Sequence, residues 1–192
     1  MMKSLKGTKT EQNLLAAFAG ESQACSRYMY FASTAKKEGY QQIAAVFEET
    51  AHQEKEHAKR FFKFLEGGMV EITAAYPAGV IGTTAENLLA AAEGELEEHS
   101  ELYPAFAKTA AEEGFPKIAA AFLAIASVEV EHERRYRQLL ARVEAGKFFN
   151  REDEIFWQCR NCGYITQGKT APELCPACLH SKAYFEEKKE NY

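Results

Sequence analysis

Residues 54–60 read Glu-Lys-Glu-His-Ala-Lys-Arg, and residues 129–135 read Glu-Val-Glu-His-Glu-Arg-Arg, 75 positions further along the chain. Each stretch contains a glutamate and a histidine three residues apart, Glu54 with His57 and Glu129 with His132. On a helix, residues three apart lie on one face, one above the other. Each pair can therefore direct a carboxylate and an imidazole at the same ion. The repeated pair predicts two helices that carry matching halves of a metal site.

The repeat extends well beyond these two motifs. The same shift of 75 residues superimposes hydrophobic, glycine and polar positions: Phe31 on Phe106, Thr34 on Thr109, Glu38 on Glu113, Gly39 on Gly114, Ile43 on Ile118 and Phe47 on Phe122. One helical hairpin is thus written twice. A duplicated hairpin predicts a bundle with a pseudo-two-fold axis, and a site on that axis receives the same ligand types from both halves.

The helix-breaking residues divide the first part of the chain into four long helices. The expected ranges are about 10–38, 40–66, 84–113 and 116–146, with Gly67 and Gly68 ending the second helix. Pro104 should kink the third helix or leave a gap in its hydrogen bonds. Two tight turns and one long crossover, between the second and third helices, are the connectivity of a ferritin-like four-helix bundle.

Acidic residues also occur on the two helices that lack the Glu-x-x-His pair. They are Glu21 on the first helix, and Glu95 and Glu98 on the third. One glutamate from each of two helices, with Glu-x-x-His from the other two, is the ligand set of di-iron and di-manganese carboxylate proteins. The shift of 75 places Glu21 on Leu96, so a slip of one residue near Pro104 is needed. Glu98 then has no counterpart, which makes the two metal positions inequivalent.

The last part of the chain has a different pattern. Its cysteines form two Cys-x-x-Cys pairs with 12 residues between them: Cys159, Cys162, Cys175 and Cys178. Four thiolates hold either zinc or a single iron. Taken alone the pattern fits a zinc ribbon, whereas a redox-capable bundle beside it favours iron. Cys25 stands apart, and we interpret it as an inert small residue.

These patterns predict two domains. We expect the bundle at residues 1–147, a linker at about 148–154, and a small metal-bound β domain of the rubredoxin or zinc-ribbon type at 155–192. A unit this small rarely folds without a metal or disulfides. The 192-residue chain has a net charge of −5 and neither a basic stripe nor an apolar run of membrane-spanning length. We therefore expect no nucleic-acid or membrane partner and, without an export signal, a cytoplasmic location.

The motifs together resemble those of the rubrerythrin family over essentially the whole chain. They include Glu54-x-x-His57, Tyr76-Pro77-Ala78-Gly79, Glu95-x-x-Glu98, Glu129-x-x-His132, Cys159-Arg160-Asn161-Cys162-Gly163-Tyr164 and Cys175-Pro176-Ala177-Cys178. The resemblance implies a peroxidase of oxidative-stress defence that reduces hydrogen peroxide to water. It also implies an antiparallel homodimer. Electrons would come from a reductase drawing on NADH, or from rubredoxin, and pass through one iron in the four-cysteine site.

The resemblance also assigns roles to individual residues. It implies that two irons are bound by Glu21, Glu54, Glu95, Glu129 and His132, and that Glu98 and His57 exchange as ligands of one iron. Tyr28 and its repeat counterpart Tyr103 would donate hydrogen bonds to ligating carboxylates, although both also fit a role as core aromatics. Zinc stays an alternative for the four-cysteine site.

Two other functions fit parts of the pattern. The same bundle could oxidise and store iron with oxygen as the oxidant, as ferritins do. The appended four-cysteine domain argues against this, because storage needs no dedicated electron return. Alternatively, a zinc ribbon could dock a partner while the bundle serves as a scaffold.

Overall fold

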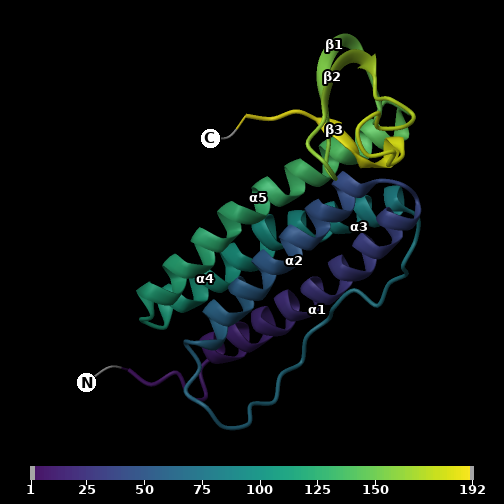
Figure 1. Cartoon of the computed structure of the whole chain (residues 1–192). Coiled ribbons are helices and arrows are strands. Elements are labelled where there is room, and N and C mark those ends of the chain that lie inside the picture. Colours follow the sequence, from purple (N-terminus) through teal and green to yellow (C-terminus); the bar gives the residue numbers. More distant parts are fainter. Residues whose placement is uncertain (1–2, 191–192) are drawn as a thin grey trace.

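Two helical hairpins form the body of the molecule, and a small sheet lies at one end of it (Figure 1). The computed structural model describes residues 3–190. The first hairpin consists of α1 (Lys9–Lys37) and α2 (Gln41–Phe62). The second consists of α3 (Thr84–Glu97), the π-helix η1 (Glu98–Leu102) and α4 (Tyr103–Glu112), followed by α5 (Pro116–Glu144). The predicted helical bundle with a small β domain is confirmed.

The two hairpin turns are built alike. Gly39 and Gly114 occupy them with φ of 86° and 83°, the left-handed region that glycine adopts without steric cost. The residue before each glycine caps a helix of the other hairpin. Glu38 accepts a hydrogen bond from the backbone N–H of Thr84, while Glu113 accepts bonds from those of Lys9 and Thr10. The duplicated sequence thus holds its two halves together reciprocally.

The second helix is shorter than the expected range of 40–66. It ends at Phe62, and the next residues turn with i to i−3 hydrogen bonds from the N–H groups of Phe64 and Leu65. Glu66 lies outside the helix, where its carboxylate accepts bonds from the Ser4 hydroxyl and the Leu5 N–H. Tertiary bonds to the N-terminal segment therefore take Glu66 out of the helix before the glycine pair is reached.

A π-helix accounts for the slip in the repeat. Glu21 and Glu95 are 74 residues apart, whereas Tyr28 and Tyr103 are 75 apart, and η1 lies between Glu95 and Tyr103. A π-helix has hydrogen bonds between residues i and i+5, so it inserts one extra residue into a turn of an α-helix, and such turns are often found at functional sites. Pro104, the second residue of α4 and two positions after η1 ends, has no N–H to donate. The expected irregularity near Pro104 is confirmed, and it takes the form of this wider turn.

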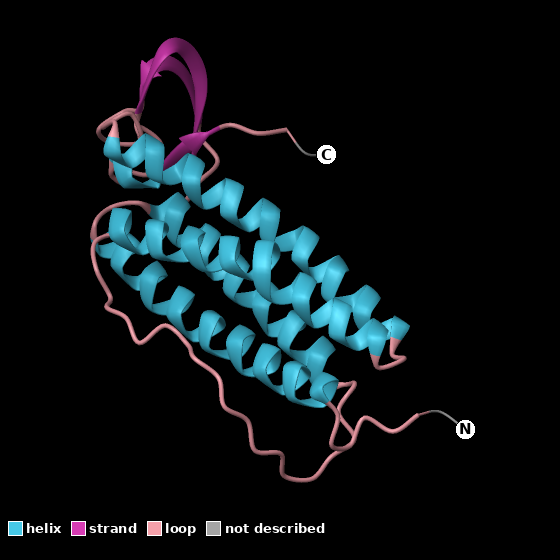
Figure 2. Ribbon diagram, turned by 180° about the vertical axis from the view of Figure 1, so that it is seen from behind, coloured by secondary structure: helices cyan, strands magenta, loops and turns pink. Residues whose placement is uncertain are grey.

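A long crossover joins the hairpins. Residues 63–83 run along the outside of the bundle beside α1, as Figures 1 and 2 show from opposite sides. The crossover is fastened midway, where the Tyr76 hydroxyl donates to the backbone carbonyl of Ala16. It ends at a capping box, in which Thr83 and Glu86 each bond to the other's backbone N–H.

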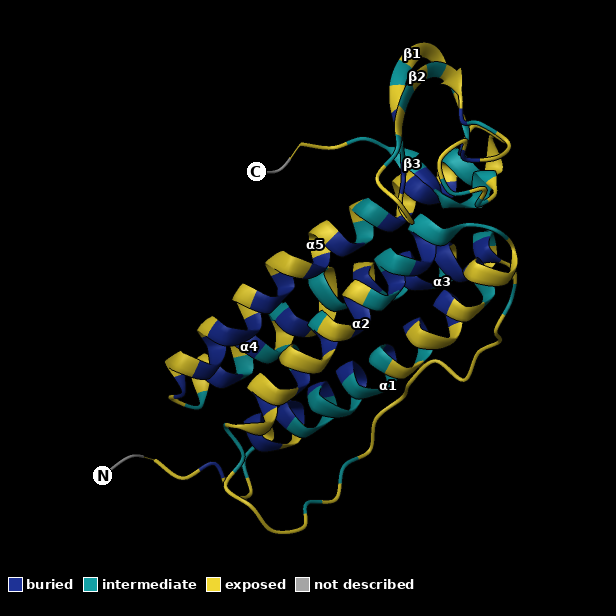
Figure 3. Cartoon of the chain, in the orientation of Figure 1, coloured by how far each residue is buried: buried dark blue, intermediate teal, exposed yellow. Residues whose placement is uncertain are grey.

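The bundle core lies between the helices (Figure 3). Two aromatic clusters fill it, one with Tyr28, Phe47 and Tyr136, the other with Tyr103 and its neighbours Phe61 and Phe122. The repeat relates these clusters residue by residue, with Phe61 in the place of Tyr136. The glutamates and histidines of the predicted site are buried in the same interior.

The C-terminal part is a three-stranded antiparallel sheet with the order β2-β1-β3. Its strands are β1 (Asn150–Cys159), β2 (Ile165–Thr170) and β3 (Phe185–Glu187), and a short 3₁₀ helix, η2 (Lys182–Tyr184), precedes β3. Trp157 is the largest buried side chain of this unit and donates its indole N–H to the Gly168 carbonyl. Among residues 3–190, no helix is long and apolar enough to cross a bilayer.

Candidate metal centres

The two Glu-x-x-His pairs meet in the middle of the bundle. Helix α2 carries Glu54 and His57, and α5 carries Glu129 and His132. Nδ1 of His57 lies 3.0 Å from Oε2 of Glu54 and 3.1 Å from Oε1 of Glu129. Nδ1 of His132 lies 2.6 Å from Oε2 of Glu129 and 3.1 Å from Oε1 of Glu54. Each of the two carboxylates thus faces both imidazoles, one oxygen to each, as a ligand that bridges two metals must.

The other two helices supply one further glutamate on each side. Oε2 of Glu21 lies 3.7 Å from Nδ1 of His57, and Oε2 of Glu95 lies 3.7 Å from Nδ1 of His132. The structure therefore forms two overlapping groups whose ligand atoms all lie within 4.8 Å of one another. The first comprises Glu21, Glu54, His57 and Glu129, and the second comprises Glu54, Glu95, Glu129 and His132.

Two tyrosines hold the outer glutamates from behind. The Tyr28 hydroxyl donates to Oε1 of Glu95 at 2.5 Å, and the Tyr103 hydroxyl donates to Oε1 of Glu21. Both tyrosines are buried, so these bonds are shielded from water. Each carboxylate keeps its other oxygen, Oε2, directed at a histidine. The tyrosines contact the ligand candidates as well as packing in the core, so the structure supports both interpretations of these residues.

The buried glutamates of the cluster are stabilised by positive charge placed between them. Burial raises the pKa of Glu21 well above its usual range and that of Glu95 to about 8. Burial would also raise the pKa of Glu54, but His132 and His57 lower it overall. For His132, burial would lower the pKa, and the carboxylates of Glu129 and Glu54 instead raise it to about 12. The buried carboxylates therefore draw cations to the bundle centre, either as protons on imidazoles or as metal ions.

A metal pair fits the donor atoms. Several carboxylate oxygens are buried without a hydrogen bond to any residue of the described chain: Oε2 of Glu21, Oε1 of Glu54, Oε2 of Glu95 and both oxygens of Glu129. Nδ1 of His132 is likewise buried without a hydrogen bond. Each unsatisfied buried polar atom costs about 1–3 kcal/mol. Cations bound between them would satisfy these atoms together, and hard oxygens with imidazole suit iron or manganese.

Glu98 lies apart from both groups. It is the first residue of η1 and lines a cavity of about 320 Å³ between α1, η1 and the crossover. Burial raises the pKa of its carboxyl, and the charges of Glu95 and Glu129 add to this. Tyr103 and Gly20 line the same cavity. The structure thus places His57 among the ligand candidates and Glu98 beside them, between the cluster and a space that admits a small molecule.

Two polar residues around the cluster were not foreseen. The side chain of His99 is only 16% exposed, and its Nε2 lies 2.7 Å from Oε2 of Glu133. This pair ties η1 to α5. Gln53 contacts the outer nitrogen of His132 at 2.9 Å. Neither residue has a counterpart in the repeat. The only sequence signal that could have indicated them is their position next to a ligand candidate, His99 after Glu98 and Gln53 before Glu54.

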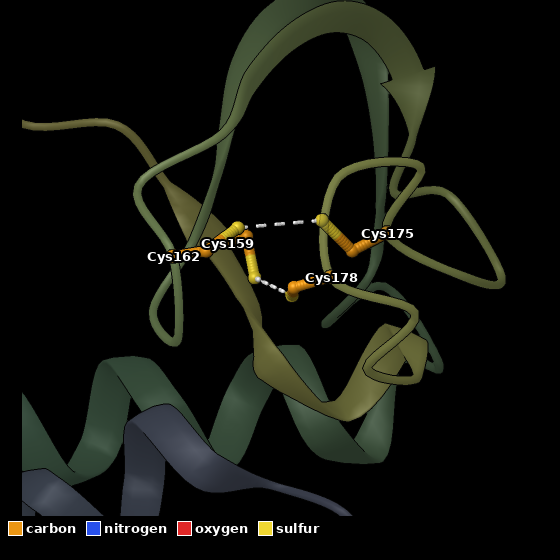
Figure 4. Close-up of side chains that lie close together, drawn as sticks. All are labelled: Cys159, Cys162, Cys175 and Cys178. Carbon is orange, nitrogen blue, oxygen red and sulfur yellow. Dashed lines mark hydrogen bonds between the residues drawn. The ribbon is translucent and has the colours of Figure 1, made fainter.

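The four cysteines converge at the end of the β domain that contacts the bundle (Figure 4). Sγ of Cys159 lies 3.8 Å from Sγ of Cys178, and Sγ of Cys162 lies 3.6 Å from Sγ of Cys175. A disulfide would bring two sulfurs to about 2.05 Å. Tetrahedral thiolates bound to a metal at about 2.3 Å lie about 3.8 Å apart. The sulfurs are therefore spaced for one tetrahedral metal ion.

The two cysteine loops share one backbone design. Gly163 and Leu179 each follow the second cysteine of a pair with positive φ, 77° and 60°. Each donates its N–H to the carbonyl of the first cysteine, Cys159 or Cys175, at 2.8 Å. The N–H of His180 lowers the pKa of the Cys178 thiol to about 6. This backbone N–H thus favours the thiolate of Cys178, the form that binds metal.

The remaining histidines and Cys25 lie away from these groups. His52 is exposed, and Nδ1 of His180 faces the backbone carbonyl of Cys178. Cys25 is partly buried in a shallow depression beside Phe18 and Phe62 on the outside of the first hairpin. None of the three belongs to a metal-ligand group among the described residues.

Comparison with known proteins identifies one family for the bundle and a second, related domain for the C-terminal sheet. The family model described as rubrerythrin matches residues 12–140, and the model of the rubrerythrin rubredoxin-like domain matches residues 157–186. A rubrerythrin of Porphyromonas gingivalis is 70% identical over 192 residues, which cover all of this chain and 96% of that one. A rubrerythrin of Nitratidesulfovibrio vulgaris is 57% identical over 185 residues, covering 96% and 97% of the two chains.

The solved structures agree with the sequence relatives. The fully reduced, all-ferrous state of nigerythrin superimposes with a TM-score of 0.63 and 34% identity, covering 97% of this chain and 92% of that one. Symerythrin from Cyanophora paradoxa, reduced with dithionite, has the same TM-score with 26% identity and covers 75% of this chain and 90% of that one. Both the bundle and the four-cysteine domain therefore have solved counterparts.

Proposed function

Because the chain belongs to the rubrerythrin family of di-iron oxidoreductases with a rubredoxin-like domain, we propose that its bundle reduces hydrogen peroxide to water. The observation that carries the proposal is the pair of carboxylates, Glu54 and Glu129, each directed at both His57 and His132. Such a site binds two metal ions side by side, which matches a two-electron substrate. The four-cysteine site would hold one iron.

The proposed ligands divide into three kinds. Glu54 and Glu129 would bridge the two ions, and Glu21 and Glu95 would each bind one ion from the outside. His57 and His132 would complete the two positions. An iron pair held by these residues would supply the two electrons that, with two protons, convert one hydrogen peroxide into two waters, and it would act as a Lewis acid.

The surrounding residues would keep the site in shape and admit the substrate. Tyr28 and Tyr103 hold Glu95 and Glu21 through one oxygen, so that the other oxygen stays directed inward. The cavity beside Glu98 is large enough for a peroxide molecule to approach from the crossover side. Glu98, which lines this cavity beside the cluster, would enter the ligand set when His57 leaves it.

Electrons would return through the four-cysteine site, one at a time. Cys162 is exposed, so a redox partner can approach this metal from outside. We propose that the partner is a reductase drawing on NADH, or rubredoxin. The antiparallel homodimer and the cytoplasmic location stay predictions, and sedimentation of the full chain measures the first.

The choice of oxidant tests the proposed function. The full chain, reduced anaerobically, is mixed in stopped flow with hydrogen peroxide or with oxygen at equal concentration. We expect the bundle iron to oxidise faster with peroxide. Oxidation by peroxide that is no faster than by oxygen would favour iron oxidation and storage instead.

A second experiment tests the division of labour between the two sites. Cys162→Ser removes one of the four thiolates and leaves the bundle unchanged. We expect one round of bundle oxidation by peroxide at the normal rate, with no steady turnover from NADH and reductase. Loss of both activities together would contradict separate roles, and a colourless wild-type protein with one zinc would exclude the electron-transfer role.

A further inference from the structure

Gln53 connects α2 to a histidine on the opposite hairpin. It precedes Glu54, and its Oε1 lies 2.9 Å from Nε2 of His132. The nitrogen it contacts is the one that faces away from the cluster, because Nδ1 of His132 faces Glu54 and Glu129. Metal-binding histidines generally donate their other N–H to an oxygen, which fixes the ring and its tautomer.

The neighbours of Gln53 determine which way its amide points. The Gln53 amide nitrogen donates to Oε1 of Glu49 at 3.3 Å, and Nη1 of Arg135 donates to the same oxygen at 3.0 Å. Arginine only donates and a carboxylate only accepts. The NH₂ group of Gln53 must therefore face Glu49, and its carbonyl must face His132. Because that carbonyl only accepts, Nε2 of His132 carries a hydrogen, and Nδ1 is the nitrogen left to bind a metal ion once that ion replaces its proton.

His57, the repeat counterpart of His132, has no equivalent series of hydrogen bonds. The counterparts of Gln53 and Glu49 are Val128 and Ala124, which have no polar side-chain atoms. The counterpart of Arg135 is Arg60, which lies 4.5 Å over the ring of Phe64 instead.

The two histidines, His57 and His132, therefore differ in their hydrogen bonds and in their exposure. The ring of His57 makes its polar contacts through Nδ1, and no described residue bonds its Nε2. The His57 side chain is also 14% exposed, against 5% for His132.

We propose that Gln53 is a positioning residue that fixes His132 as an Nδ1 metal ligand, and that the lack of an equivalent for His57 makes the His57 position the weaker and more exchangeable of the two. The inference rests on the proposed ligand set. It gives a structural reason for inequivalent metal positions in a site whose ligands are otherwise duplicated.

Anaerobic Fe(II) titration of the full chain tests the proposal. Gln53→Leu removes the acceptor, and Gln42→Leu on the same helix is the matched control. Loss of such a partner typically costs 10–100-fold in metal affinity, so we expect one of two Fe(II) ions to bind about 10–100-fold more weakly in Gln53→Leu only. Gln53→Glu combined with Glu49→Gln, which keeps an acceptor toward His132 and reverses the bond between positions 49 and 53, should restore the affinity.

Proton NMR of the ferrous protein adds a readout that is independent of stability. We expect one slowly exchanging histidine N–H in the wild type, from His132, which exchanges rapidly in Gln53→Leu. The reciprocal variant Val128→Gln should give His57 a partner and slow a second N–H. Two ions bound with unchanged affinity in Gln53→Leu and an unchanged N–H would overturn the role of Gln53. A wild-type bundle that binds no pair of ions would overturn the ligand set itself.

Discussion

Replacing Tyr28 or Tyr103 with phenylalanine should destabilise the protein, whereas the same replacement at Tyr136 should not. The Tyr28 and Tyr103 hydroxyls donate to Glu95 and Glu21, whose side chains are 1% and 0% exposed. The Tyr136 hydroxyl is also buried, but it has no hydrogen-bond partner among the described residues. The three substitutions remove the same atom from similar aromatic clusters, so they isolate the hydrogen bond to a carboxylate.

The magnitude follows from the partner that each hydroxyl loses. A hydrogen bond to a charged group contributes about 1.5–3 kcal/mol, and water cannot replace it at these depths. For a chain of this size, 1 kcal/mol shifts the melting temperature by about 2–4 °C. Tyr28→Phe and Tyr103→Phe should therefore lower it by about 3–12 °C. Tyr136→Phe breaks no hydrogen bond, so its shift should stay within about 2 °C or be upward.

The assay is thermal unfolding of the metal-loaded full chain, followed by far-ultraviolet circular dichroism. Metal content is measured for each variant, so that a change in loading is not mistaken for a change in hydrogen bonding. A loss at Tyr136 as large as at the other two positions would refute the reasoning, because packing alone would then explain all three.

Two further predictions concern the cysteine loops and the duplicated helix caps. Gly163→Ala forces a side chain into the left-handed region at a cost of about 1 kcal/mol, so it should speed metal loss to a chelator; Leu179→Gly, which relieves that strain, should not. Unchanged metal loss in Gly163→Ala would contradict this. Hydrogen bonds from Thr10 lower the pKa of Glu113, so its contribution to stability is present above its ordinary pKa of about 4.5 and disappears as the pH falls through the lowered value. Urea unfolding should therefore give Glu113→Gln a lower free energy of unfolding than the wild type at neutral pH, and the difference should vanish in acid. The neighbouring Glu112→Gln should show no such pH dependence.

The parts of the molecule that repeat a local pattern could be predicted from the sequence. Glycine and proline positions indicated the hairpins, and the duplicated Glu-x-x-His pair indicated which faces meet. The cysteine spacing likewise predicted the sulfur cluster. In each case the signal lies within a few residues, because helix periodicity and tight loops are set locally.

The parts that depend on distant partners could not be predicted. His99 bonds to Glu133, 34 residues away, and Gln53 bonds to His132, 79 residues away. No local pattern marks such pairs. The end of α2 was predicted too far along the chain for the same reason, because Glu66 bonds to Ser4 and Leu5, more than 60 positions before it. The slip in the repeat was visible in the numbering, but only the structure shows the π-helix that causes it.

The most direct test of the account is Mössbauer spectroscopy of the full chain loaded with ⁵⁷Fe, before and after one equivalent of hydrogen peroxide under anaerobic conditions. The account predicts three irons per chain, two in a carboxylate-bound pair and one bound by four thiolates. Peroxide should convert the ferrous pair to a coupled ferric pair. A chain with no paired iron, or a pair that stays ferrous after peroxide, would contradict the account.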